Sequence, residues 1–484
     1  MRNRCFRTLS AASLVVVVSF SFVSNAEVRL PAIFGDHMVL QADEPLPVWG
    51  WADPGESIMV AIGGQTKQAK ADERGAWRVT LDPIEAGERL QLIVRGDASD
   101  GEPIMLTDIL VGEVWICSGQ SNMEWPLRAT EDAESAIAEA HEPELRLFVV
   151  TNRTAATPQE DVEGRWVSCN PQTVADFSAV GYYFGRMLSH DLDRPVGLID
   201  STWGGTPAEA WTSREKLETV DAAAALLARW DDTEEGWPQH RPASLYNAMI
   251  DPLAPFAIAG AIWYQGESNA TRAEQYGSLF PAMIHDWRER WGQGDFPFGF
   301  VQLANFKQRA EAPGDSDWAE LREAQLMTLE STPNSGMAVI IDIGDASDIH
   351  PRNKKDVGER LAKWALATAY DRDIAYSGPI YTSMRRDGQS IILEFDHVGD
   401  GLVSRGDDGA LDGFAVAGSD RRFVWADARI EGDTVVVSSP EVSDPVAVRY
   451  GWADNPVCTL YNEAGFPASP FRTDDWPGVT DGRR

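Results

Sequence analysis

The 484-residue sequence contains little cysteine and far fewer basic than acidic side chains. Its four cysteines, Cys5, Cys117, Cys169 and Cys458, form no Cys-x-x-Cys pair or Cys/His cluster, which excludes a disulfide-stapled scaffold and argues against structural zinc. The sequence leaves open whether Cys117 pairs with Cys169. With 42 Lys+Arg against 75 Asp+Glu, the formal net charge of −33 repels phosphate backbones and anionic membranes. We therefore expect no nucleic-acid partner.

The sequence also lacks an apolar run long enough to span a bilayer. The longest candidate, residues 11–23, has about 13 residues, whereas a transmembrane helix needs roughly 20. It follows a basic start and precedes Ser24-Asn25-Ala26, small residues that a signal peptidase accepts. Residues 1–26 are therefore predicted to be a cleaved signal peptide, and the protein to be secreted or periplasmic, with no membrane association after cleavage.

The remaining sequence has a globular composition, with 43% apolar and 24% charged residues. At roughly 150 residues per domain, its length suggests about three domains. Short strand-like runs separated by Gly, Pro and Asp predict β structure in residues 27–107 and again in residues 373–484. Residues 108–372 have a different pattern, in which apolar strands alternate with helices.

In this middle domain the apolar runs predict strands, and the helical periodicities predict helices between them. The predicted strands are 109–117, 145–150, 195–199, 260–264, 298–303 and 337–343, and the predicted helices are 131–139, 179–189, 222–230, 276–291, 318–329 and 354–370. Strands buried on both faces that alternate with helices favour a parallel sheet with helices on each side. The predicted fold class is α/β, flanked by N- and C-terminal β-sandwich-like modules.

Working residues of open parallel sheets lie beyond the carboxyl ends of the strands. After the first strand comes Ser121, where a hydroxyl at the sheet edge and an amide near a helix N-terminus suit a nucleophile and an oxyanion donor. A simple Ser/Asn helix cap is the alternative. The segment is not a GxSxG elbow, because position 123 is Met.

Two further strand ends carry groups that could donate hydrogen bonds to an oxyanion. Gly204 and Gly205 let the backbone approach a ligand closely, although an ordinary tight turn would use the same residues. Gln265 and Asn269 offer side-chain N–H groups, and Glu267 between them offers a carboxylate that could orient partners. The alternative for this third segment is a helix cap followed by a solvated loop.

His350 is the only one of seven histidines that follows a buried strand. It suits a general base, and Asp348 or Asp345 before it could hold the imidazole tautomer. A surface histidine in an acidic loop is the alternative. Together, the four strand ends supply a nucleophile, oxyanion donors and an acid–histidine pair, a complete set for acyl transfer.

These residues occur within an ordered set of motifs that resembles a known family. The motifs are Gly112-Glu113-Val114-Trp115 through Gly119-Gln120-Ser121-Asn122-Met123, Trp203-Gly204-Gly205-Thr206, Trp263-Tyr264-Gln265-Gly266-Glu267-Ser268, Asp348-Ile349-His350-Pro351 and the stretch from Tyr461 to Asp474. The sequence resembles the sialate O-acetylesterase-like carbohydrate esterases, a branch of the SGNH (GDSL-type) hydrolases. The resemblance implies a three-layer α/β/α SGNH domain.

The resemblance also implies roles for individual residues. Ser121 would be the nucleophile and His350 the base, with the amides of Ser121 and Gly205 and the side chain of Gln265 as the oxyanion hole. SGNH enzymes place the acid three residues before the histidine, where this chain has Ser347, so Asp348 or Asp345 would support His350, or the site would work as a dyad. Whether Gln265 or Asn269 donates a side-chain N–H to the oxyanion stays open. No metal or organic cofactor is implied.

The sequence thus predicts an exported esterase that removes acetyl groups from sugars. The substrate would be an O-acetylated sialic acid or a neutral plant polysaccharide such as xylan or xyloglucan. Side chains expected to contact it are Gln120, Asn122, Glu267 and Asn269. Two other classes remain open: a glycoside hydrolase using Glu267 with Asp345 or Asp348, and a non-catalytic sugar-binding protein. The oligomeric state is not predicted.

Overall fold

The computed structural model describes residues 27–97, 102–233 and 235–483. The predicted signal peptide, residues 1–26, lies outside the described residues. Within them, no helix is both long and apolar enough to cross a membrane. Cys117, Cys169 and Cys458 are free thiols, so the structure contains no Cys117–Cys169 disulfide.

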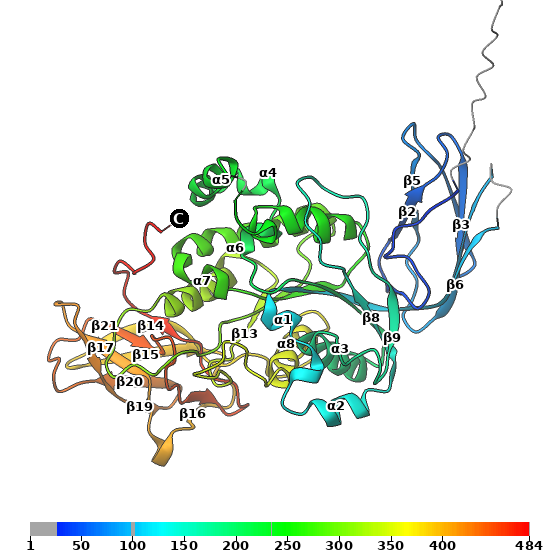
Figure 1. Cartoon of the computed structure of the whole chain (residues 1–484). Helices are drawn as coiled ribbons and strands as arrows, with labels where there is room; N and C mark the ends of the chain where they lie inside the picture. The colour runs from blue at the N-terminus through cyan, green and yellow to red at the C-terminus, as the bar shows by residue number, and fades with distance from the viewer. Residues whose placement is uncertain (1–26, 98–101, 234, 484) are drawn as a thin grey trace, which may run out of the picture.

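A mainly parallel sheet forms the centre of the molecule (Figure 1). Its strands run in the order β13-β12-β11-β7-β10-β8-β9, and all neighbours are parallel except β9, which pairs antiparallel with β8. The strands are β7 (Ile104–Gly119), β8 (Glu142–Val149), β9 (Trp166–Cys169), β10 (Val196–Thr202), β11 (Gly260–Tyr264), β12 (Phe298–Val301) and β13 (Ser335–Ala338). The predicted parallel sheet is therefore present, with one antiparallel edge.

Helices cover both faces of this sheet, which makes three layers. The longer helices α6 and α7 pack together on one face, and α3 and α8 pack together on the other (Figure 1). The helices are α1 (Ser121–Glu124), α2 (Ala133–Glu139), α3 (Ala179–Leu192), α4 (Arg214–Leu217), α5 (Ala224–Asp231), α6 (Ala273–Trp291), α7 (Asp317–Ser331) and α8 (Lys355–Thr368). Serine caps begin two of the four long helices, because Ser178 and Ser316 each accept a backbone N–H from the first turn.

The last predicted strand of the middle domain is shorter than expected. β13 ends at Ala338, although the apolar run continues to Ile343. Ile343 N–H closes a turn on the carbonyl of Ile340, and Arg360 of α8 takes the carbonyl of Val339 and the carboxylate of Asp342. These contacts pull the chain out of the sheet and into the segment that carries His350.

The N-terminal β strands share their core with the central domain. The strands are β1 (Val39–Gln41), β2 (Leu46–Trp51), β3 (Ser57–Ile62), β4 (Gln65–Lys70), β5 (Ala76–Leu81) and β6 (Arg89–Gly96). β7 is 16 residues long; its first half pairs with β1 and β6, and its second half with β10 and β11. The predicted boundary at residues 107/108 therefore falls within one continuous strand.

The C-terminal part contains two four-stranded antiparallel sheets around a separate apolar core. One sheet has the order β14-β15-β20-β19 and the other β18-β17-β21-β23, with β16 and β22 as an additional pair. The strands are β14 (Ile380–Asp387), β15 (Ser390–Asp396), β16 (Leu402–Ser404), β17 (Phe414–Ala417), β18 (Phe423–Trp425), β19 (Asp427–Glu431), β20 (Thr434–Ser438), β21 (Ala447–Tyr450), β22 (Leu460–Asn462) and β23 (Phe471–Arg472).

A buried arginine joins this C-terminal part to the central domain. The guanidinium of Arg322, on α7, donates to the carbonyls of Leu303 and Ala304 beyond β12 and of Ala453 and Asp454 in the C-terminal part. Its side chain is fully buried. The position of the segment after β12 is therefore fixed by contacts from both sides.

Candidate active site

Three predicted site segments meet because their strands are neighbours in the sheet. β7 lies between β10 and β11, so the residues after Gly119, Thr202 and Tyr264 share one edge. The backbone links these ends directly: Gln120 N–H donates to the carbonyl of Tyr264, and Trp203 N–H to that of Gly119. Ser121 follows as the first residue of α1.

The segment before α8 brings His350 to Ser121. His350 Nε2 lies 2.9 Å from Ser121 Oγ, and His350 Nδ1 lies 3.2 Å from Asp348 Oδ1. The same carboxylate oxygen accepts the backbone N–H of His350 at 2.9 Å. Asp345 instead accepts from the N–H and hydroxyl of Ser347. Of the two candidate acids, Asp348 is the one in contact with the imidazole.

The environment of His350 favours its neutral form. Partial burial and the nearby Lys354 ammonium lower the pKa of His350, and these effects outweigh Asp348, which raises it. The indole of Trp125 also stacks on the imidazole. An imidazole that is neutral near pH 7 can accept a proton from a hydroxyl at hydrogen-bond distance.

The turn after β10 lies against the nucleophile candidate. A Cβ added at Gly204 would lie 3.3 Å from Ser121 Cβ and 2.9 Å from Glu124 Oε2, so this position has little room for a side chain. Gly204 N–H donates to Glu124 Oε2 at 2.6 Å. The next residue, Gly205, has a φ of +74°, which favours glycine, and among the described residues its Cβ position is open. Gly205 thus has the space at its Cβ position that Gly204 lacks.

The two side-chain amides predicted as donors are occupied within the protein. Gln265 Nε2 donates to the carbonyl of Thr206 and to Asn269 Oδ1, and Asn269 Nδ2 donates to Glu209 Oε2. Both side chains are fully buried. In this geometry they join the end of β11 to the turn after β10, and an oxyanion contact by Gln265 would require its carboxamide to rearrange.

The side chains predicted to contact substrate also make internal hydrogen bonds. Gln120 Oε1 accepts from the N–H groups of Gly266 and Ser268, and Asn122 Nδ2 donates to Glu267 Oε1. Gln120 and Asn122 are buried, and so is the Glu267 carboxylate oxygen Oε2. Gln120, Asn122 and Asn269 are thus buried and Glu267 is partly buried, and all four make hydrogen bonds within the protein. Their contacts with substrate stay a prediction.

Sequence reasoning did not single out three side chains of this site: Glu124, Trp125 and Lys354. Trp125 and Glu124 follow Ser121 within one helical turn, so their proximity in sequence is a usable signal. Lys354 is four residues beyond His350, at the start of α8. A lysine at a helix N-terminus opposes the helix dipole, and that mismatch is the only sequence signal for it.

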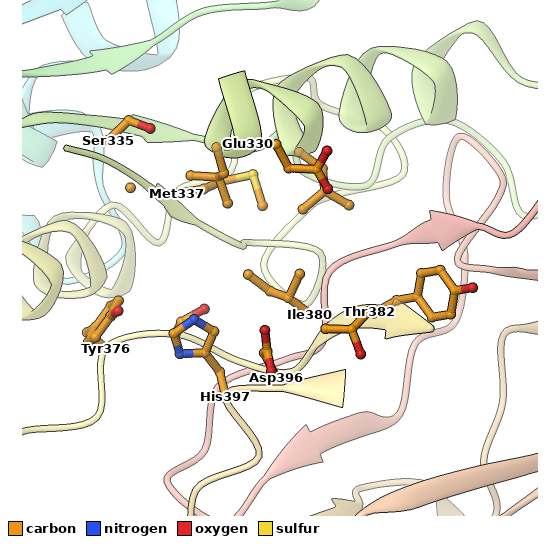
Figure 2. A pocket seen from close by; sticks show the side chains of 13 residues that line it. Glu330, Ser335, Met337, Tyr376, Ile380, Thr382, Asp396 and His397 are labelled. Carbon is orange, nitrogen blue, oxygen red and sulfur yellow. The ribbon is translucent and has the colours of Figure 1, made fainter. Parts of the chain in front are cut away.

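A cavity lies between the central domain and the C-terminal part. It has a volume of about 430 Å³ and is lined by the end of α7, β13 and the first strands of the C-terminal part (Figure 2). Its lining includes Glu330, Met337, Tyr376 and His397 and none of the predicted site residues. The Ser121–His350 pair is therefore not part of this cavity.

Parallel strands covered by helices on both faces, with a serine–histidine contact at their carboxyl edge, define the class of α/β ester hydrolases. Comparisons with known proteins agree with this class. The family described as carbohydrate esterase, sialic acid-specific acetylesterase, matches residues 111–367. The sialate O-acetylesterases of Homo sapiens and Pongo abelii are each 30% identical to this chain, over 93% of it and 94% of their own length.

A solved structure is similar over nearly the whole chain. The carbohydrate acetylesterase from Xanthomonas citri is 43% identical, with a TM-score of 0.86, and the match covers 93% of this chain and 100% of that one. The chain belongs to the sialic acid-specific acetylesterase family of carbohydrate esterases, and it is a carboxylic ester hydrolase.

Proposed function

We propose that this protein is an exported carbohydrate O-acetylesterase that works through a Ser121 acyl-enzyme. The observation that carries the proposal is the 2.9 Å contact between Ser121 Oγ and His350 Nε2 at the carboxyl edge of the sheet. The contact joins residues 229 positions apart in the chain. Membership of a carbohydrate esterase family supports the same chemistry.

In the proposed mechanism, Ser121 Oγ attacks the acetyl carbonyl carbon while His350 Nε2 takes the hydroxyl proton. Asp348 accepts a hydrogen bond from Nδ1–H and stabilises the imidazolium that forms. His350 then gives the proton to the departing sugar oxygen. Water attacks the acetyl-enzyme with His350 again as base, and acetate leaves as Ser121 regains its proton.

The developing oxyanion needs N–H donors near Ser121. The N–H of Ser121 belongs to the first turn of α1, where backbone N–H groups have no intrahelical acceptor. Gly205 lies in the turn that approaches Ser121. We infer that these two amides are the principal donors, because the N–H groups of Gln265 are engaged by Thr206 and Asn269. Each donor of this kind typically contributes about 2.7–4 kcal/mol to lowering the barrier.

The proposed organisation assigns the chemistry to residues 108–372, as an SGNH-type three-layer domain. The N-terminal β module (27–107) and the C-terminal β module (373–484) would support it. Export depends on the sequence pattern of residues 1–26 alone.

The negative charges near Ser121 and over the whole chain affect which substrate can approach. Glu124 and Asp348 place two carboxylates beside Ser121, and the whole chain carries −33. Both would oppose the carboxylate of a sialic acid, whereas neutral acetylated xylan or xyloglucan would meet no such repulsion. The relatives are named for sialate, so both substrate classes belong in the test.

The decisive experiment compares wild type with Ser121→Ala on acetylated sialic acid, xylan and xyloglucan, with released acetate as the readout. We expect Ser121→Ala to lose at least about 10³-fold in kcat/KM. Ser118→Ala, which removes a buried hydroxyl on β7 that donates to the Ser201 carbonyl on β10, should keep activity. Acetate release that survives Ser121→Ala would overturn the mechanism.

The glycoside hydrolase alternative is less well supported. It requires Glu267 to reach a sugar, but its Oε1 accepts from Asn122 and its Oε2 is buried. A direct check is reducing-sugar release from the unacetylated polysaccharides: we expect none. Release that Glu267→Gln abolishes and Ser121→Ala leaves intact would favour this alternative instead.

A further inference from the structure

A fully buried lysine lies next to the Ser121–His350 pair. Lys354 directly precedes α8, and its Nζ donates to Asn122 Oδ1. The same ammonium lies over two aromatic rings, 5.8 Å from the centroid of Trp125 and 5.3 Å from that of Tyr264. One carboxamide oxygen and two aromatic rings, all from segments near Ser121, thus contact this ammonium.

This placement is expensive in free energy. Burying an ammonium removes its hydration, and a positive charge at a helix N-terminus opposes the helix dipole. Burial lowers the pKa of Lys354 to about 7, although the Glu267 and Asp348 carboxylates partly offset this by raising it. Burial likewise raises the pKa of Glu267. A methionine would fill the same volume at lower cost, so packing alone does not account for a lysine here.

The lysine fixes the orientation of the Asn122 carboxamide. An ammonium can only donate, so the Asn122 oxygen must face Lys354 and the NH₂ group must face away. That NH₂ group donates to Glu267 Oε1 and, at 3.0 Å, to the carbonyl of Ile349. Asn122 and Ile349 are the chain neighbours of Ser121 and His350. The Asn122–Ile349 hydrogen bond therefore runs beside the Ser121–His350 contact and links the same two segments.

We propose that Lys354 is a positioning residue for the proposed Ser121–His350 pair: it orients Asn122, which holds the segment carrying His350, and its charge keeps His350 in the neutral form that accepts a proton. This inference rests on the proposed function of Ser121 and His350. Lys354 and Asn122 would act together as a buried hydrogen-bonded pair next to Ser121 and His350, and the Glu267 carboxylate would supply the opposite charge.

The charges around His350 predict the direction in which its pKa moves when Lys354 is replaced. Two charged groups act on the imidazole in opposite directions: Asp348 raises the pKa of His350, and Lys354 lowers it. Two further carboxylates lie near the pair: Glu124, which accepts from the Gly204 N–H, and Glu267, which accepts from Asn122 and also raises the pKa of Lys354. Because Lys354 is mostly protonated below pH 7, its charge is present over the range in which His350 titrates.

The test uses Lys354→Met, which keeps the volume of the side chain and removes its charge. The rate at which a serine-reactive fluorophosphonate labels the enzyme is measured against pH, since this rate follows the neutral form of His350 without a sugar substrate. We expect the acid limb of the profile to move to higher pH by about half a unit or more, with a lower plateau. Lys355→Met is the matched control: this neighbouring exposed lysine pairs with Glu359, and its loss should leave the acid limb in place.

If the acid limb of folded Lys354→Met stays at its wild-type position, the proposal is wrong, whatever the plateau. A lysine with a structural role alone would change the labelling rate but not its pH dependence. Should Lys354→Met fail to fold, Lys354→Met/Glu267→Gln removes both buried charges, and the limb should still move upward. Failure of the proposed function has a different signature: labelling and acetate release would then persist in Ser121→Ala. The two failures are therefore distinguishable.

Discussion

The indole of Trp125 lies nearly parallel to the imidazole of His350, with ring centroids 4.7 Å apart and an angle of 18° between the planes. Trp125 comes from the segment of the nucleophile candidate, and His350 from a segment more than 200 residues further along the chain. The stack restricts the imidazole to the plane in which Nε2 faces Ser121. The ammonium of Lys354 lies 5.8 Å from the centroid of the same indole.

Replacing Trp125 should therefore lower activity without removing the reacting groups. We expect Trp125→Ala to reduce kcat by roughly tenfold, because stacking of this kind is worth about 0.5–1.5 kcal/mol. Trp125→Phe should retain most of the activity, since it keeps an aromatic ring. Kinetics on an acetylated sugar check this, and equal losses in the two variants would show that the stack does not matter.

The pH dependence should separate Asp348 from Asp345. Activity requires neutral His350, so it is lost as pH falls through the pKa of His350, which lies below its ordinary value of 6.5. Asp348 raises that pKa, so Asp348→Asn should move the acid limb of kcat/KM to lower pH while reducing kcat by up to about 10⁴-fold.

Asp345→Asn is the matched control, because that carboxylate bonds to Ser347 and not to the imidazole. It should leave both the limb and kcat close to wild type. A larger loss of activity in Asp345→Asn than in Asp348→Asn would reverse the assignment of the acid.

Gly204 should tolerate no side chain. The added methyl group of Gly204→Ala would lie 2.9 Å from Glu124 Oε2 and 3.3 Å from Ser121 Cβ, and would displace one of them. We expect kcat to fall at least about tenfold with little change in melting temperature. Gly64→Ala serves for comparison: that glycine, in the turn between β3 and β4, has an open Cβ position, and its substitution should leave kcat unchanged.

Arg322 should be a major determinant of stability. Arg322→Met would remove the hydrogen bonds of Arg322 to four carbonyls on both sides of the contact with the C-terminal part. Two of these carbonyls keep another donor: Ala304 accepts from the Trp318 indole, and Asp454 accepts from the Phe306 N–H. We expect the free energy of unfolding to fall by about 3–5 kcal/mol, measured by urea denaturation. Arg429→Met removes an exposed arginine paired with Glu431 and should change it by less than about 1 kcal/mol.

The local elements of the central domain were largely predictable, because each buried strand and amphipathic helix is encoded in contiguous residues. The predicted strand 260–264 is β11, and the predicted helix 179–189 lies within α3. β9, β14 and β19 were not predicted: they are short or exposed strands whose partners, not their own residues, make them strands. The predicted boundary at residues 107/108 is another limit: the burial pattern changes there from alternating to continuous, but β7 runs through it as one strand.

The sequence by itself determined the α/β class and the polar segments that follow its buried strands, with Ser121, Gly205 and His350 among them, because apolar runs and helical periodicity are local properties. Only the tertiary structure decided which strands are neighbours, which carboxylate contacts His350, that the Gln265 amide is engaged elsewhere, and that Lys354 is buried against Asn122. The Gln265–Thr206 and Lys354–Asn122 contacts join residues 59 and 232 positions apart, and such buried polar groups find their partners only once the sheet edge has assembled.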